Sequence, residues 1–154
     1  ARRRERADGQ RVWRAGVRGV GASTARASGF NSQTDYLQTA NAQICLFAQV
    51  ESRAGLNALP EILAIEGVDG VFIGPSDLSA DLGYLGNPNT PEVMAAIDTA
   101  LDAIVSAGKA SGIFAVDPTD AERYLARGIT FVAIASDINS MANALRGTVN
   151  RFRS

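Results

Sequence analysis

The chain has 154 residues, of which 46% are hydrophobic and 20% charged, and its formal net charge is −1. This composition is that of a globular domain with an apolar core, and it excludes an intrinsically disordered chain. With one cysteine and no histidine, the chain can form neither an internal disulfide nor a zinc site or catalytic triad that depends on histidine.

The charge is unevenly distributed along the chain. Residues 1–26 hold 8 of the 15 basic residues with only two acids and carry a net charge of +6, whereas residues 27–154 carry −7. A basic arm can bind nucleic acid, but Trp13 is the only aromatic residue among these arginines and no nucleic-acid-binding module follows. No apolar run approaches the ~18 residues of a membrane span, and the amino-terminal stretch lacks the apolar core of a signal peptide. We therefore expect a cytoplasmic protein that binds neither nucleic acid nor a membrane.

Short apolar runs alternate with helical patterns from residue 44 onward. Thr90 is a suitable N-cap, Pro91 suits a first helical position, and Gly108 suits a helix end. Asp117-Pro118 likewise starts a helix that runs to Gly128. The patterns predict strands at 44–50, 71–74, 112–116 and 131–135, and helices at 34–42, 53–65, 78–82, 91–107, 118–128 and 137–152.

Strands that are apolar on both faces and joined by helices predict a parallel sheet in an α/β fold. Two architectures fit this order, a doubly wound sheet and a segment of a (β/α)₈ barrel. A complete barrel needs roughly 250 residues, so a chain of 154 residues cannot close one alone. A half barrel leaves two open sheet edges and lacks half of the inner packing. We therefore expect weak folding of the chain alone, association with another copy, or a partner that supplies the missing strands.

An acidic residue follows each predicted strand. In parallel α/β folds, ligands bind at the carboxyl ends of the strands. Asp117 and Asp137 each precede a helix, and we interpret both as N-caps. Glu51 and Asp77, which follow the first two strands, are the candidate ligand-binding carboxylates.

Gln49 and Glu51 alternate along the first strand and are therefore predicted to point to the same side. Two carboxylates on adjacent strand ends form an all-oxygen site that suits Mg²⁺ or Mn²⁺. Two structural alternatives remain open: Glu51 pairs with Arg53 or caps the next helix, and Asp77 caps the short helix at 78–82.

Two other features carry no predicted function. Cys45 lies inside the first predicted strand and is expected to be an inert core thiol. The loop GVRGVG at 16–21 reverses the glycine spacing of a dinucleotide-binding loop and follows no clear strand, so we expect no nucleotide site there.

Three segments resemble one enzyme family: RGVGASTARASGFN (18–31), FAQVES (47–52) and GVDGVFIGPSDLSADLGYLGNP (67–88). They are similar to the HpcH/HpaI-type divalent-metal-dependent pyruvate aldolases, which include 4-hydroxy-2-oxoheptane-1,7-dioate aldolase and 2-dehydro-3-deoxyglucarate aldolase. The resemblance implies a (β/α)₈ barrel of which residues 16–154 form the carboxyl-terminal half, about four β/α units, whereas residues 1–15 match poorly.

The resemblance also implies roles for four residues. Glu51 and Asp77 match the metal ligands. Gln49 matches a substrate-contacting glutamine, the backbone at Ser76 matches a position that helps to hold the pyruvate carboxylate, and Asp77 is also expected to bind the substrate. It implies cleavage of a 4-hydroxy-2-oxo acid to pyruvate and an aldehyde, with Mg²⁺ or Mn²⁺ as cofactor and Co²⁺ as a third option. Phe72 and Phe114 fall in the region that shapes the pocket, although ordinary core packing explains Phe72 as well. We expect a homo-oligomer.

The chain departs from the family in one essential respect. The family's catalytic histidine and arginine lie on the amino-terminal half, so no catalytic residue is assigned in this chain. We therefore expect impaired activity from a truncated or frameshifted product. The alternative is a non-catalytic remnant or a module that binds a metal ion or an oxo acid.

Overall fold

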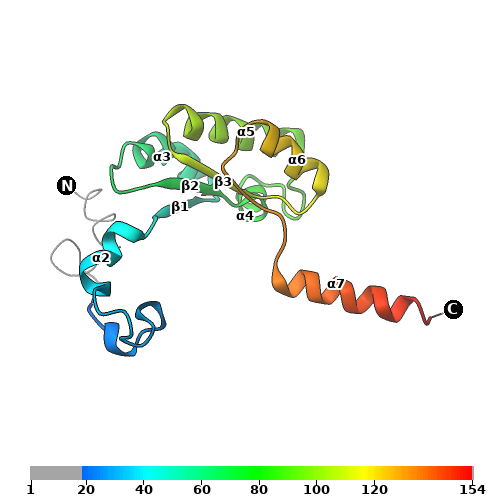
Figure 1. The fold of residues 1–154 in the computed structure, drawn as a ribbon. Coiled ribbons are helices and arrows are strands. Elements are labelled where there is room, and N and C mark those ends of the chain that lie inside the picture. Colours follow the sequence, from blue (N-terminus) through cyan, green and yellow to red (C-terminus); the bar gives the residue numbers. More distant parts are fainter. Residues whose placement is uncertain (1–18, 154) are drawn as a thin grey trace.

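The computed structural model describes residues 19–153, in which helices and short strands alternate as predicted (Figure 1). The GVRGVG loop lies partly, and the basic segment 1–15 wholly, outside the described residues. The strands are β1 (Phe47–Val50), β2 (Gly70–Ile73), β3 (Ala110–Phe114) and β4 (Phe131–Ala133). The helices are η1 (Ala22–Thr24), η2 (Arg26–Ser28), α2 (Tyr36–Gln43), α3 (Arg53–Leu63), α4 (Pro75–Asp81), α5 (Pro91–Ser106), α6 (Pro118–Ala126) and α7 (Asp137–Asn150).

The four strands form one parallel sheet in the order β1-β2-β3-β4. The Phe47 ring of β1 and the Phe131 ring of β4 nevertheless lie only 6.0 Å apart between centroids. Because three strand spacings amount to about 14 Å in a flat sheet, this contact requires the sheet to curve and bring its edges together. The curvature is that of a barrel segment.

The helices α3, α5 and α6 cover one side of this sheet (Figure 1). Their buried side chains pack with strand residues that point to the same side, and the contact removes most of the apolar surface of both layers from water. A doubly wound sheet would carry helices on both faces, so that alternative is wrong. The core includes Val50, Val71, Ile73 and Ile113 from the strands and Leu59, Val93, Ile97, Leu101, Ile104 and Tyr124 from the helices.

The opposite, concave side of the sheet is lined by aromatic rings that lie over glycines. A Cβ atom at Gly70 would meet the Phe47 ring at 2.5 Å, and one at Gly112 would meet the Phe72 ring at 2.6 Å. The Phe72 ring also packs against Phe131, with centroids 5.7 Å apart. Glycine on one strand therefore makes room for an aromatic ring from the neighbouring strand.

Most helix starts follow the local sequence. Asp117 caps α6 as predicted, because its Oδ1 atom accepts hydrogen bonds from the backbone N–H groups of Thr119 at 2.8 Å and Asp120 at 3.4 Å. Thr90 stands at the N-cap of α5 without a side-chain capping bond. The predicted cap at Asp137 is wrong: Ser136 is the N-cap of α7, and its hydroxyl accepts from Asn139 N–H at 3.2 Å.

Cys45 also departs from its predicted place. The first strand begins at Phe47 instead of Ile44, and Cys45 is exposed rather than buried in the core. The chain enters the sheet at Leu46, whose N–H donates to Asp69 Oδ2 at 2.6 Å. The apolar run Ile44–Val50 therefore includes residues that precede the strand.

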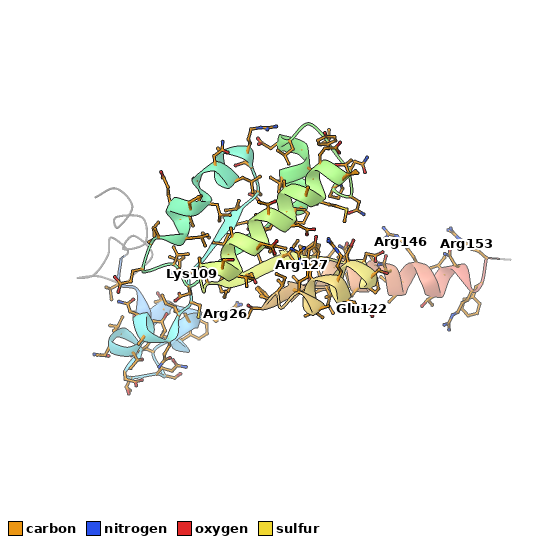
Figure 2. The ribbon with its side chains drawn as sticks, turned by 90° about the horizontal axis from the view of Figure 1, so that it is seen from above. Arg26, Lys109, Glu122, Arg127, Arg146 and Arg153 are labelled. Carbon is orange, nitrogen blue, oxygen red and sulfur yellow. The ribbon has the colours of Figure 1, made fainter. Side chains whose placement is uncertain are left out.

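The last helix, α7, extends away from the sheet and its covering helices in both views (Figures 1 and 2). Its apolar residues recur at helical spacing but are exposed: Ile138 by 69%, Met141 by 61%, Leu145 by 60% and Val149 by 48%. None of the helices within residues 19–153 has the length and the apolar composition of a membrane-spanning helix.

Candidate active site

Gln49 and Glu51 meet at the carboxyl end of β1. Gln49 Nε2 donates a hydrogen bond to Glu51 Oε2 at 2.6 Å, so the two side chains lie on the same side of the strand, as their alternation predicts. The Gln49 residue is exposed and Glu51 is half-buried. The amide thus holds one carboxylate oxygen in place and leaves the other oxygen available for a second partner.

Glu51 neither caps the helix that follows it nor pairs with Arg53. Ser52, not Glu51, caps α3, because its hydroxyl accepts from the Gly55 N–H at 3.1 Å. The Arg53 N–H donates to Asp81 Oδ2 at 2.6 Å, and within residues 19–153 its side chain forms no salt bridge with Glu51. The Glu51 carboxylate is therefore not used to start or tether the following helix.

Ser76 and Asp77 occupy the first turn of α4. The helix begins at Pro75 with Gly74 as its N-cap, so the alternative in which Asp77 caps a helix at 78–82 is wrong. Both Ser76 and Asp77 are exposed. An acidic residue in a first turn is stabilised by the positive end of the helix, and no hydrogen bond or ion pair of the Asp77 side chain occurs in the described part of the chain.

Gly74 lies between Gln49 and Glu51 on one side and the turn that contains Ser76 and Asp77 on the other. Its N–H donates to Val50 O at 3.1 Å, which continues the β1–β2 pairing to the start of α4. A Cβ atom built on Gly74 would lie 2.8 Å from Glu51 Oε2 and 3.1 Å from Gln49 Nε2. The structure thus brings Gln49 and Glu51 against the residue from which the turn containing Asp77 begins.

The donor chemistry at this edge suits a hard cation. Mg²⁺ is commonly bound by one or two carboxylates, with water and substrate oxygens completing the coordination shell. Within residues 19–153, no group of three or more His, Cys, Asp or Glu side chains is arranged to hold a metal. A metal ion bound by Glu51 and Asp77 would therefore need further oxygen ligands in addition to these two carboxylates.

A cavity of about 190 Å³ lies beside Ser76 and was not foreseen from the sequence. Its lining includes Phe114, Asp117 and Tyr124. Burial raises the pKa of Tyr124 above its ordinary value of 10.0, an effect that the neighbouring Arg123 charge partly opposes. The spacing of Ala121 and Tyr124 on one helical face is the sequence pattern that could have indicated this burial.

Comparisons with known proteins agree on one family. The profile of the HpcH/HpaI aldolase/citrate lyase family matches residues 3–144. The chain is 53% identical over 138 residues to a 4-hydroxy-2-oxo-heptane-1,7-dioate aldolase of Shigella sonnei, covering 90% of this chain and 53% of that protein. It is 51% identical over 138 residues to a hydroxypyruvate/pyruvate aldolase of Agrobacterium fabrum, covering 90% of this chain and 52% of that one.

A solved structure extends the similarity to the fold. An HpcH/HpaI aldolase/citrate lyase family protein from Burkholderia cenocepacia matches with a TM-score of 0.79 and 40% identity, covering 92% of this chain and 55% of that chain. The described chain is accordingly a partial TIM barrel. It spans about half the length of the curated relatives it matches.

Proposed function

The chain belongs to the HpcH/HpaI aldolase/citrate lyase family, and we propose that it carries the metal-binding half of a class II aldolase. The proposed reaction is the reversible cleavage of a 4-hydroxy-2-oxo acid, such as 4-hydroxy-2-oxoheptanedioate, to pyruvate and an aldehyde. The observation that supports this proposal most directly is the Gln49–Glu51 hydrogen bond. The two side chains that form it lie against Gly74 at the start of α4.

In this reaction the C4 hydroxyl loses its proton as the C3–C4 bond breaks. The aldehyde carbonyl forms, and the electron pair of the broken bond becomes the pyruvate enolate, which then takes a proton at C3. A divalent cation held by Glu51 and Asp77 would supply Lewis-acid stabilisation of the charge on the keto oxygen. Gln49 would hold Glu51 in a binding position and contact the substrate, and the backbone at Ser76 would help to hold the pyruvate carboxylate.

The absence of histidine from all 154 residues favours a second candidate for the isolated chain. Without a histidine base to accept the hydroxyl proton, the chain would bind metal and oxo acid but cleave the carbon–carbon bond at a rate near background. Residues 16–154 would then act as the carboxyl-terminal half of a barrel whose base lies elsewhere. Retro-aldol turnover at the rate of a full-length relative by the isolated chain would contradict this assignment.

Calorimetric titration of the chain with Mn²⁺ in the presence of pyruvate tests the site. We expect Glu51→Ala and Asp77→Ala each to abolish the metal-dependent heat, because each removes one of the two protein carboxylates. Glu122→Ala is the matched control, since Glu122 is an exposed acid on α6 (Figure 2). Undiminished binding by either site variant would overturn the metal assignment.

The choice of metal follows from the same titration. Oxygen ligands suit Mg²⁺ and Mn²⁺, while Co²⁺ usually binds such a site more tightly than Mn²⁺ by the general order of transition-metal affinity. We propose Mg²⁺ or Mn²⁺ as the cofactor and expect all three ions to compete for one site. Binding of the ions at separate sites would contradict a single centre at Glu51 and Asp77.

We further propose that the protein is a cytoplasmic homo-oligomer. The exposed apolar face of α7, formed by Ile138, Met141, Leu145 and Val149, is the kind of surface that a second subunit covers. A second copy is the proposed partner because the same face and the same open sheet edges recur on each copy, so that one symmetric contact could cover both.

A further inference from the structure

The backbone at Gly74 does not itself require glycine. Its φ of −101° and ψ of 94° are extended values that any L-residue before a proline adopts. Ser, Asp or Asn at this N-cap would add a hydrogen bond to the helix, whereas Gly74 provides no side-chain capping bond. Glycine at this position therefore calls for an explanation outside the backbone.

The side chains of Glu51 and Gln49 occupy the space that a side chain at position 74 would fill. A Cβ atom on Gly74 would lie 2.8 Å from Glu51 Oε2, 3.1 Å from Glu51 Cβ and 3.1 Å from Gln49 Nε2. The first of these distances is shorter than two such atoms can approach without moving. By contrast, a Cβ atom on Gly147 of α7 would meet no atom within 4 Å.

The backbone around Gly74 is fixed on both sides, so the Glu51 side chain is the group that would have to move. Gly74 is buried, and its N–H is bonded to Val50 O at 3.1 Å. At the other end of α4, Asp81 Oδ2 accepts from the Arg53 N–H at 2.6 Å. Between these ties, Leu78 is fully buried in the core.

We propose that Gly74 is a positioning residue whose missing side chain lets the Glu51 carboxylate lie against the start of α4. A methyl group there displaces the carboxylate, and with it the Gln49–Glu51 hydrogen bond, from the position in which Glu51 binds a divalent cation. This inference deepens the proposed function and rests on it, because it assigns Gly74 no contact with metal or substrate.

The test compares Mn²⁺ affinity in the wild type, Gly74→Ala and Gly147→Ala. We expect Gly74→Ala to weaken binding about tenfold, as the loss of a group that orients a metal ligand does, and Gly147→Ala to leave it unchanged. Circular dichroism of each variant shows whether the fold is retained. Unchanged Mn²⁺ affinity in folded Gly74→Ala would overturn the inference while leaving the proposed metal site in place. Absence of Glu51-dependent binding in the wild type would overturn both.

A second variant shows whether Gly74 acts through Glu51. Glu51→Asp shortens the side chain by one methylene and withdraws the carboxylate from Gly74. We expect Gly74→Ala to cost less Mn²⁺ affinity in the Glu51→Asp chain than in the wild type, because coupled residues give non-additive effects. Equal losses in both backgrounds would show that Gly74 does not act through this carboxylate and would overturn the inference, and this comparison holds even if Gly74→Ala lowers stability.

Discussion

The two faces of the sheet differ in how far they are covered: helices bury the convex face, whereas the concave face is partly exposed. On the convex face, the helices α3, α5 and α6 bury a continuous core whose largest members are fully inaccessible to water. On the concave face, Phe131 is 51% exposed and Phe114 36% exposed. The helix α7 extends away from the sheet (Figure 1), and its apolar residues are exposed. The convex layer is therefore stabilised within this chain, whereas the concave face and α7 present apolar surface suited to further contacts.

The largest expected effect of a single substitution lies in the convex core. Leu101 on α5 is fully buried, so Leu101→Ala should lower the free energy of unfolding by about 3 kcal/mol through lost burial and the cavity that remains. Val105→Ala, on the same helix but at a position 45% exposed, should cost clearly less. Urea denaturation measures both, and equal losses would contradict the assignment of the core to this face.

A smaller effect is expected where aromatic rings lie over glycines on the concave face. Gly112→Ala places a methyl group 2.6 Å from the Phe72 ring, and overpacking of this kind should lower the free energy of unfolding by about 2 kcal/mol. Phe72→Ala removes the ring, so adding Gly112→Ala to that variant should cost less than it does in the wild type. A neutral Gly112→Ala variant would mean that the ring is not confined there.

The smallest effect on the fold is expected from α7. Leu145 is 60% exposed, so Leu145→Ala should change the free energy of unfolding of a single chain by less than about 0.5 kcal/mol. The same variant should weaken self-association, because it removes an apolar side chain from the proposed contact. Ser140→Ala, on the polar side of α7, is the control. Sedimentation that shows the same mass for Leu145→Ala and the wild type at all concentrations would argue against α7 as the contact.

The sequence predicted the order of elements because local signals decide it. Pro118 after the capping carboxylate of Asp117, and the glycines that follow α5 and α6, act within a few residues and mark helix ends. The strands were placed one to three residues away from their observed bounds at several ends, since an apolar run does not show where pairing begins. The exposed Cys45 has this origin. The cap of α7 is a separate case, because the adjacent Ser136 and Asp137 are both good capping residues and Ser136 makes the bond.

The curvature of the sheet could not be predicted in the same way. The curvature shows in the contact of Phe47 with Phe131, two residues that are far apart in the sequence and meet only when four strands have paired. The chain length and the family resemblance together predicted a partial barrel, and the position of the helices on one side of the sheet confirms it (Figure 1).

The candidate site was predicted in part. The period-2 alternation of Gln49 and Glu51 correctly placed both side chains on one side of β1. The role of Gly74 was missed because its importance lies in an atom it lacks, although a glycine at an N-cap position where Ser or Asp is stronger was a signal in the sequence. Tyr124 was missed because the cavity that it lines joins α6 to loops from other strands.

The most direct measurement is the position of Mn²⁺ in crystals soaked with the ion, read from its anomalous scattering. We predict one strong peak at coordination distance from a carboxylate oxygen of both Glu51 and Asp77, with Gln49 still bonded to Glu51. A peak that contacts only one of the two carboxylates, or that lies at another place on the chain, would contradict a shared metal site at Glu51 and Asp77.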